Sequence, residues 1–111
     1  MRVLDPSTRQ VLVVADEAKG FAGRSVGLLG APGLPPGRGL LIRTCQVHTI
    51  GMQFTIDAVY LSKGGRVVRV RTLRPGRLGP LVPSARWVLE LAEGEAARLH
   101  LTPGTPLLLD A

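Results

Sequence analysis

The 111-residue chain is 45% hydrophobic and 20% charged, a composition that excludes a disordered protein and is sufficient for a single domain over residues 1–111. Its net charge of +6 comes from twelve arginines and two lysines against eight acidic residues. No apolar run approaches the roughly 18 residues of a membrane-spanning helix, and no basic segment followed by an apolar stretch opens the chain. We therefore expect a cytoplasmic protein with no membrane partner.

The first third of the chain predicts one strand, one weak helix and a loop. Residues 10–15 are a compact apolar run of strand length. Residues 17–29 are the best helical candidate, but three glycines among them each weaken a helix by about 1 kcal/mol relative to alanine, so we expect a short or broken helix. Residues 30–39 are rich in proline and glycine and predict a loop.

The rest of the chain predicts short strands joined by turns, because glycines and prolines, fourteen and nine in the whole chain, divide it into short pieces. Gly64 and Gly65 favour a tight hairpin turn, and residues 75–83 predict a second loop. On the strand after the hairpin turn, alternation puts Arg69 and Arg71 in solvent. The expected strands are residues 40–44, 54–61, 67–70, 85–91 and 107–109.

Residues 85–91 show the clearest alternation of faces. Trp87, Leu89 and Leu91 are predicted to face the core, with Trp87 as a core anchor rather than a ligand platform. Arg86, Val88 and Glu90 form the opposite face of this strand. Residues 93–99 predict one helical turn or a plain turn.

The segment from Cys45 to Asp57 concentrates a thiol, an imidazole, a hydroxyl, a thioether and a carboxylate. A thiol beside an imidazole can act as a nucleophile, and a carboxylate can orient the imidazole. This gives one alternative, a small hydrolase or thiol-dependent enzyme that uses Cys45, His48 and Asp57. No known nucleophile signature surrounds these residues, and the C-x-x-H spacing lacks a second pair of strong ligands, so we assign no catalytic residue, metal or cofactor.

Two non-catalytic interpretations of this segment stay open. In the first, the thiol and thioether fill the core while the hydroxyl and carboxylate hydrogen-bond to backbone groups. In the second, the segment lines a small pocket for a polar or anionic ligand, and Arg24 or Arg43 provides a forked cationic donor. The candidate ligand-binding residues are Arg24, Cys45, His48, Thr49, Met52 and Asp57.

Five of the twelve arginines lie between Arg66 and Arg77. A basic stripe can bind nucleic acid, but the four aromatic residues that could stack on bases are dispersed along the chain. We expect a solvated face here and keep nucleic-acid binding as a second alternative. The arginine-rich, asparagine-free composition is also typical of adaptation to high temperature.

Five motifs occur in a fixed order along the chain. They are Arg24-Ser-Val-Gly-Leu-Leu-Gly30, Cys45-x-x-His-Thr-x-Gly-Met-x-Phe-x-Ile-Asp57, Gly65-Arg-Val-Val-Arg-Val70, Leu73-x-Pro-Gly-Arg77 and Val88-Leu-Glu-Leu-x-x-Gly94. From about Ala15 to Leu109 the chain thus resembles the family called domain of unknown function 192, also called uncharacterised protein family 0127. The family motif maps onto Arg24, Gly27, Leu28, His48, Thr49, Met52 and Asp57.

The resemblance implies a mainly β fold, a compact β sandwich or partly closed barrel with one or two short helices. It implies no established activity. Many relatives carry an export signal, whereas this chain begins almost directly at the domain. Our leading hypothesis is a non-enzymatic binding or accessory module, present as a monomer or small homo-oligomer, with a small polar pocket near His48, Thr49, Asp57 and Arg24.

Overall fold

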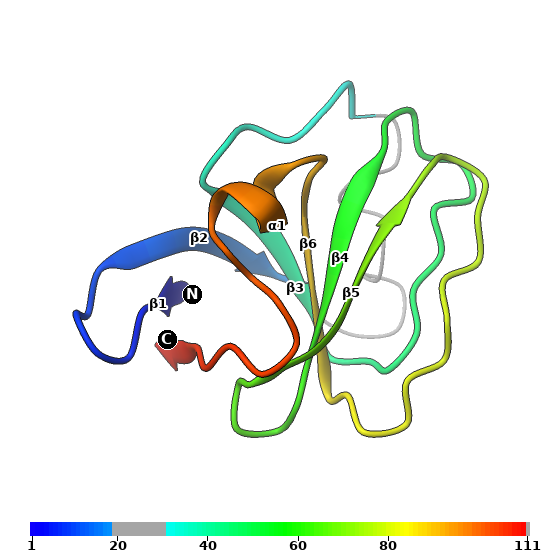
Figure 1. Cartoon of the computed structure of the whole chain (residues 1–111). Helices are drawn as coiled ribbons and strands as arrows, with labels where there is room; N and C mark the ends of the chain where they lie inside the picture. The colour runs from blue at the N-terminus through cyan, green and yellow to red at the C-terminus, as the bar shows by residue number, and fades with distance from the viewer. Residues whose placement is uncertain (19–30, 111) are drawn as a thin grey trace.

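The computed structural model describes residues 1–18 and 31–110. Its strands form one curled sheet in the order β5-β4-β6-β3-β2-β1-β7 (Figure 1). Among the described neighbouring pairs, β2 and β3 run parallel and the others antiparallel. The elements are β1 (Arg2–Leu4), β2 (Val11–Glu17), β3 (Arg38–Ile42), β4 (Ile56–Leu61), β5 (Val67–Leu73), β6 (Trp87–Ala92), α1 (Glu95–Arg98) and β7 (Leu108–Asp110).

The structure confirms the five strands expected after residue 40, with shifted ends, and the strand expected at residues 10–15. It adds β1, which is too short for its alternation to be recognised in the sequence but pairs with both β2 and β7. The single turn of α1 lies within residues 93–99, as predicted. The helix expected over residues 17–29 is wrong at Glu17, which ends β2, and otherwise falls almost entirely outside the described residues.

The curl of the sheet brings the start of β5 against the segment that precedes β7. Arg66 and Pro106 form an isolated antiparallel bridge. The Val67 N–H donates to the Thr105 carbonyl at 2.9 Å, and the Leu107 N–H donates to the Gly65 carbonyl at 3.1 Å. These bonds close one end of the curl, so the partly closed barrel is the form that the structure takes.

Gly65 is required at this closure. Its φ of +91° lies in the region that favours glycine, and a Cβ built on it would lie 2.5 Å from the Leu107 carbonyl oxygen. Two successive glycines at residues 64–65 thus do more than form the predicted hairpin turn. The second glycine also lets another part of the chain approach the backbone.

Two hydrophobic clusters lie on opposite faces of the sheet. The cluster on the face that carries α1, called the inner core, comprises Val3, Val13, Ala15, Leu41, Val59, Leu61, Val67, Leu89, Leu91, Ala96, Leu101 and Leu107. The other, called the outer core, comprises Leu40, Ile42, Val47, Met52, Ile56, Ala58, Tyr60, Leu73, Val82, Ala85 and Val88. Residues of β3, β4 and β6 alternate between the two clusters, so these strands are buried on both faces.

This double burial corrects the expectation for residues 85–91. Leu89 and Leu91 face the inner core as predicted, and Trp87 packs against it while remaining half-buried. Val88 and Glu90, expected on the opposite and more polar face, are both fully buried. Alternation identified the two faces correctly, but it could not show that both are covered.

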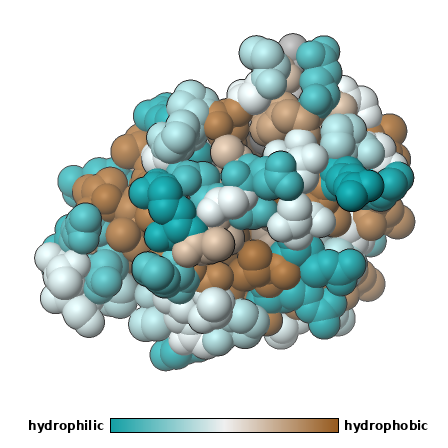
Figure 2. Space-filling view, turned by 45° about the horizontal axis from the view of Figure 1, so that its top comes forward, coloured by the Kyte–Doolittle hydropathy of each residue, from teal (hydrophilic) through white to brown (hydrophobic). Residues whose placement is uncertain are grey.

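On the face that Figure 2 presents, apolar patches are small and are separated by hydrophilic side chains. Within the described ranges no helix is long and apolar enough to cross a membrane.

Candidate functional site

The segment from Cys45 to Ile50 pairs with a second loop, residues 76–82, and the two together are called the loop ribbon. His48 and Leu78 form an antiparallel bridge. On either side of this bridge, the Gly79 N–H donates to the Val47 carbonyl at 2.8 Å and the Thr49 N–H donates to the Arg77 carbonyl at 2.8 Å. The loop predicted at residues 75–83 is therefore held by the candidate segment itself.

Thr49 is the polar centre of the loop ribbon. It is fully buried, and its hydroxyl donates to the Arg74 carbonyl at 2.5 Å while it accepts a bond from the Arg77 N–H at 2.9 Å. The Thr49 carbonyl also accepts a bond from the Gly76 N–H at 2.9 Å. One side chain and its backbone thus fix the turn of residues 74–77.

The remaining candidate residues of the segment do not gather around Thr49. Met52 is part of the outer core, and Cys45 is half-buried against it. His48 is exposed, and its Nδ1 accepts a bond from the Ile50 N–H at 3.2 Å. Arg24 lies outside the described residues.

Asp57 lies on the inner face of β4, opposite Met52 and Cys45. It is only 3% exposed, and its Oδ2 accepts bonds from the Gly94 and Ala96 N–H groups at 3.0 Å each. Its Oδ1 accepts a bond from the Thr72 hydroxyl at 2.9 Å. Asp57 therefore holds the start of α1 against the sheet, and it does not form a line with Cys45 and His48.

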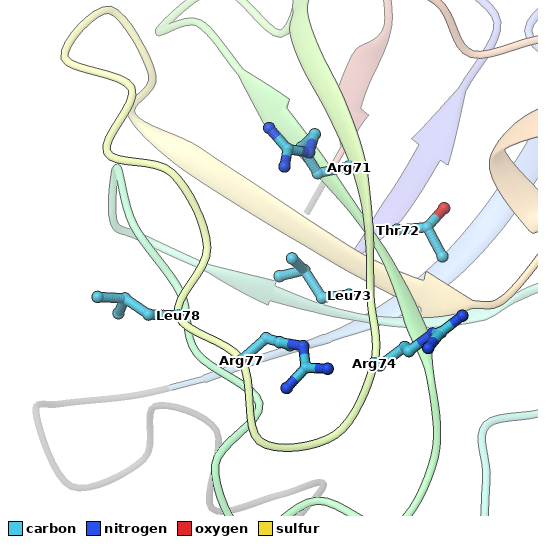
Figure 3. Close-up of a pocket in the computed structure, with 6 residues that line it drawn as sticks. All are labelled: Arg71, Thr72, Leu73, Arg74, Arg77 and Leu78. Carbon is cyan, nitrogen blue, oxygen red and sulfur yellow. The ribbon is translucent and has the colours of Figure 1, made fainter.

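A cationic pocket lies at the end of β5, where the chain turns back toward the sheet. It has a volume of about 330 Å³, and it is called the arginine pocket; its lining residues are Arg71, Thr72, Leu73, Arg74, Arg77 and Leu78. In Figure 3, Arg71 and Leu73 project to one side of the strand, Thr72 and Arg74 project to the other, and Arg77 extends into the bend of the returning loop. The three guanidinium groups surround the end of the strand.

The charge of this pocket is uncompensated in the part of the chain that the structure describes. None of its six lining residues is acidic, and Arg71, Arg74 and Arg77 make no side-chain hydrogen bond or ion pair there. The sequence carried the signal, three arginines around a Pro-Gly turn. Alternation correctly predicted that Arg69 and Arg71 are exposed, but the expectation of a solvated face did not include a pocket lined by Arg71, Arg74 and Arg77.

Three candidate residues support this pocket without lining it. Thr49 fixes the turn that carries Arg74 and Arg77. His48 bridges to Leu78, and Asp57 accepts a hydrogen bond from the Thr72 hydroxyl. The polar segment singled out in the sequence therefore adjoins the arginine pocket, whose charged groups come from elsewhere in the chain.

Glu90 is a second feature that sequence analysis placed incorrectly. It is fully buried in β6 between Leu40 of β3 and Ala58 of β4, and neither carboxyl oxygen has a hydrogen-bond partner among the described residues. Burial raises the pKa of Glu90 to about 8. The available signal was an acidic residue within an apolar run, Val88 to Leu91.

Metal chemistry finds no support in the described ranges, where no group of three or more His, Cys, Asp or Glu side chains could hold an ion. The candidate site is thus a cationic pocket on a rigid frame, with no assembled nucleophile, base and carboxylate.

Comparison with known proteins identifies the family. The family model described as Uncharacterized ACR, domain of unknown function 192, matches residues 3–109. No curated protein matches the chain.

Two solved structures share the fold. A protein of unknown function from Novosphingobium aromaticivorans DSM 12444 has a TM-score of 0.80 and 22% identity, over 97% of this chain and 82% of that one. A protein from Sinorhizobium meliloti 1021, described as a "putative transcription regulator", has a TM-score of 0.72 and 19% identity, over 96% and 89%. The family match confirms the resemblance seen in the motifs, and the chain belongs to the family of domain of unknown function 192.

Proposed function

We propose that this domain is a non-enzymatic binding module, that its site is the arginine pocket, and that its ligand is a small anion with several acidic oxygens, such as a phosphate or a polycarboxylate. The observation that carries the proposal is that Arg71, Arg74 and Arg77 all line one cavity, which has no acidic lining residue. Guanidinium groups bind phosphate and carboxylate through paired N–H donors. Their charge attracts an anion before contact.

The frame of the pocket favours binding because it is already ordered. Thr49 holds the turn of residues 74–77 through four hydrogen bonds of its hydroxyl and backbone. An ordered site loses less conformational entropy when a ligand binds. The volume of about 330 Å³ falls in the range of small-molecule sites.

The same geometry favours binding over catalysis. The lining residues are arginine, threonine and leucine, which supply charge and shape but no ready general base at neutral pH. The thiol alternative requires Asp57 to orient His48, yet Asp57 is engaged by three donors on the other face of the sheet.

The test is calorimetric titration of the chain with inorganic phosphate and with citrate. We expect saturable binding that weakens at least about tenfold in the Arg74→Gln, Arg77→Gln double variant, since each lost charge-assisted contact is worth roughly 1.5–3 kcal/mol. The matched control is Arg2→Gln, Arg38→Gln, which removes the same charge from β1 and β3, where both arginines form exposed ion pairs and neither lines the arginine pocket. If both double variants weakened anion binding equally, the weakening would come from net charge alone and the proposal would be overturned.

Nucleic-acid binding is the second candidate, and the position of β5 favours it. This strand is one edge of the described sheet, and arginines extend from Arg66, just before the strand, through Arg69 to the arginine pocket. The description of the Sinorhizobium protein as a "putative transcription regulator" is consistent with nucleic-acid binding by that protein. The arginines of β5 also have an explanation that needs no nucleic acid, because charged side chains on an edge strand keep that strand from pairing with other chains.

Salt dependence separates the two candidates. Nucleic-acid binding that engages several of these arginines should lose affinity steeply between low and moderate salt, with a slope near the number of phosphates contacted. Absence of any shift with single-stranded or duplex probes at low salt would remove the second candidate and leave the first unaffected.

A further inference from the structure

We propose a second binding site at the opposite end of β4 and β5, for an anion that carries a planar ring, the chemistry of a nucleotide. The site is a pocket of about 410 Å³, called the tryptophan pocket, and it is lined by Arg43, Lys63, Arg86 and Trp87. It combines three cations with the chain's sole tryptophan. It goes beyond the proposed function, because it shares no lining residue with the arginine pocket.

The strand register assembles this pocket from three distant parts of the chain. Ile42 pairs with Val88, which places Arg43 beside Trp87 at the ends of β3 and β6. On the other side of β6, Leu61 pairs with Trp87, and the hairpin turn that begins after Leu61 brings Lys63 to the same end. Antiparallel pairing therefore collects the cations around the indole.

The indole provides a fixed apolar surface. Trp87 packs against the inner core while one part of it stays accessible. The Arg43 guanidinium carbon lies 5.3 Å from the centroid of the Trp87 ring, within the range of a cation–π contact. A guanidinium plane or an indole face can stack with a nucleobase, because both are flat and polarisable.

The other two cations are positioned for an acidic group. One guanidinium nitrogen of Arg86, Nη1, donates to the Pro83 and Ala85 carbonyls at 2.9 and 3.1 Å, which leaves the other guanidinium donors for a ligand. Lys63 is exposed in the hairpin turn. None of the four described lining residues is acidic, so a phosphate would meet two or three positive charges without a competing carboxylate.

The two pockets are far enough apart to act independently. The β4–β5 ladder runs from the pair Leu61 with Val67 to the pair Ile56 with Leu73, a span of roughly 20 Å at about 3.4 Å per residue. The first pair adjoins the tryptophan pocket and the last adjoins the arginine pocket. A mononucleotide cannot reach both.

Fluorescence of Trp87 reports on this site directly, because the chain has no other tryptophan. The experiment titrates the chain with adenosine monophosphate, adenosine and inorganic phosphate. We expect saturable quenching by the nucleotide, with adenosine and phosphate each at least about tenfold weaker, since each then lacks one of the two kinds of contact. Equal response to all three compounds, or none to the nucleotide, would overturn the proposal.

Amino-acid substitutions then show which of the two pockets binds the nucleotide. Arg43→Gln with Lys63→Gln should weaken nucleotide binding at least about tenfold, which is the loss of roughly 1.4 kcal/mol. Arg74→Gln with Arg77→Gln removes the same charge from the arginine pocket and should leave the fluorescence titration unchanged. Circular dichroism of both double variants tests whether they are folded.

Two further outcomes would contradict the second site, one from the variants and one from a comparison of ligands. Equal weakening by the two double variants would show a response to net charge alone. Binding of an oligonucleotide that needs both pockets, with no binding of the mononucleotide, would show that the tryptophan pocket is one end of a nucleic-acid surface. Failure of phosphate to bind the arginine pocket leaves the fluorescence result intact, so the two proposals fail separately.

Discussion

Replacing Glu90 by glutamine should make the protein more stable at neutral pH and nearly unchanged in mild acid. Glu90 is fully buried, and neither carboxyl oxygen has a hydrogen-bond partner among the described residues. Its pKa rises from 4.5 to about 8 on folding because burial disfavours the charged form. Glutamine has a similar shape and carries no charge at any pH, so it removes this ionisation and little else.

The direction of the pH effect on stability follows from the protons that the folded and unfolded states bind. Between pH 4.5 and about pH 8 the folded protein keeps the Glu90 proton while the unfolded chain has lost it. The free energy of unfolding therefore falls as pH rises through this window. One pKa unit corresponds to about 1.4 kcal/mol, so the loss is about 3 kcal/mol at pH 7 and about 5 kcal/mol above pH 8.

Urea unfolding at about pH 5, 7 and 9 measures this effect in the wild type, in Glu90→Gln and in Glu93→Gln, an exposed carboxyl three residues away. All other groups titrate in both proteins, so the difference between wild type and Glu90→Gln isolates one carboxyl. Burial raises the pKa of Tyr60 on the same sheet face above its ordinary 10, which keeps its ionisation outside the window. Parallel pH profiles for wild type and Glu90→Gln would refute the reasoning.

Two further predictions concern the frame of the fold. Asp57→Ala leaves the Thr72 hydroxyl and the Gly94 and Ala96 N–H groups without their buried acceptor and should lower the free energy of unfolding by about 3 kcal/mol. A loss below about 1 kcal/mol in denaturant unfolding would mean that water replaces the carboxylate. Gly65→Ala should lower it by at least about 2 kcal/mol, because the new Cβ would lie 2.5 Å from the Leu107 carbonyl oxygen, whereas Gly64→Ala meets nothing within 4 Å and should be nearly neutral. Equal thermal midpoints for the two glycine variants would contradict the proposed closure.

Much of the fold was predictable because strand signals are local. Alternation and the Gly and Pro punctuation located six of the seven strands and the turn of α1. The curl of the sheet depends instead on bonds such as Leu107 N–H to the Gly65 carbonyl, which join residues that no local pattern relates. The three-residue β1 was not predicted for a similar reason, since its stability comes from its two neighbours and not from its own sequence.

The candidate site was predictable only in part. The polar segment did contain a buried organising residue, Thr49, but its hydrogen-bond partner Arg77 lies 28 residues away. Asp57 was grouped with His48 because the two are close in sequence, whereas β4 directs Asp57 to the opposite face of the sheet. Proximity along a chain is a poor guide to proximity in a sheet, where register decides which side chains meet.

The two proposed pockets lie where this sheet can still accept a ligand. The central strands β3, β4 and β6 are buried on both faces, so a polar group placed on them is removed from water, as Glu90 is. The strand ends and the edge strand β5, in contrast, combine a paired backbone with access to solvent. Arginine pairs well with such positions, because its apolar stem packs on the sheet while its forked head stays hydrated. We therefore propose that ligand binding accounts for the arginines that line the two pockets, and the paired double variants test that proposal.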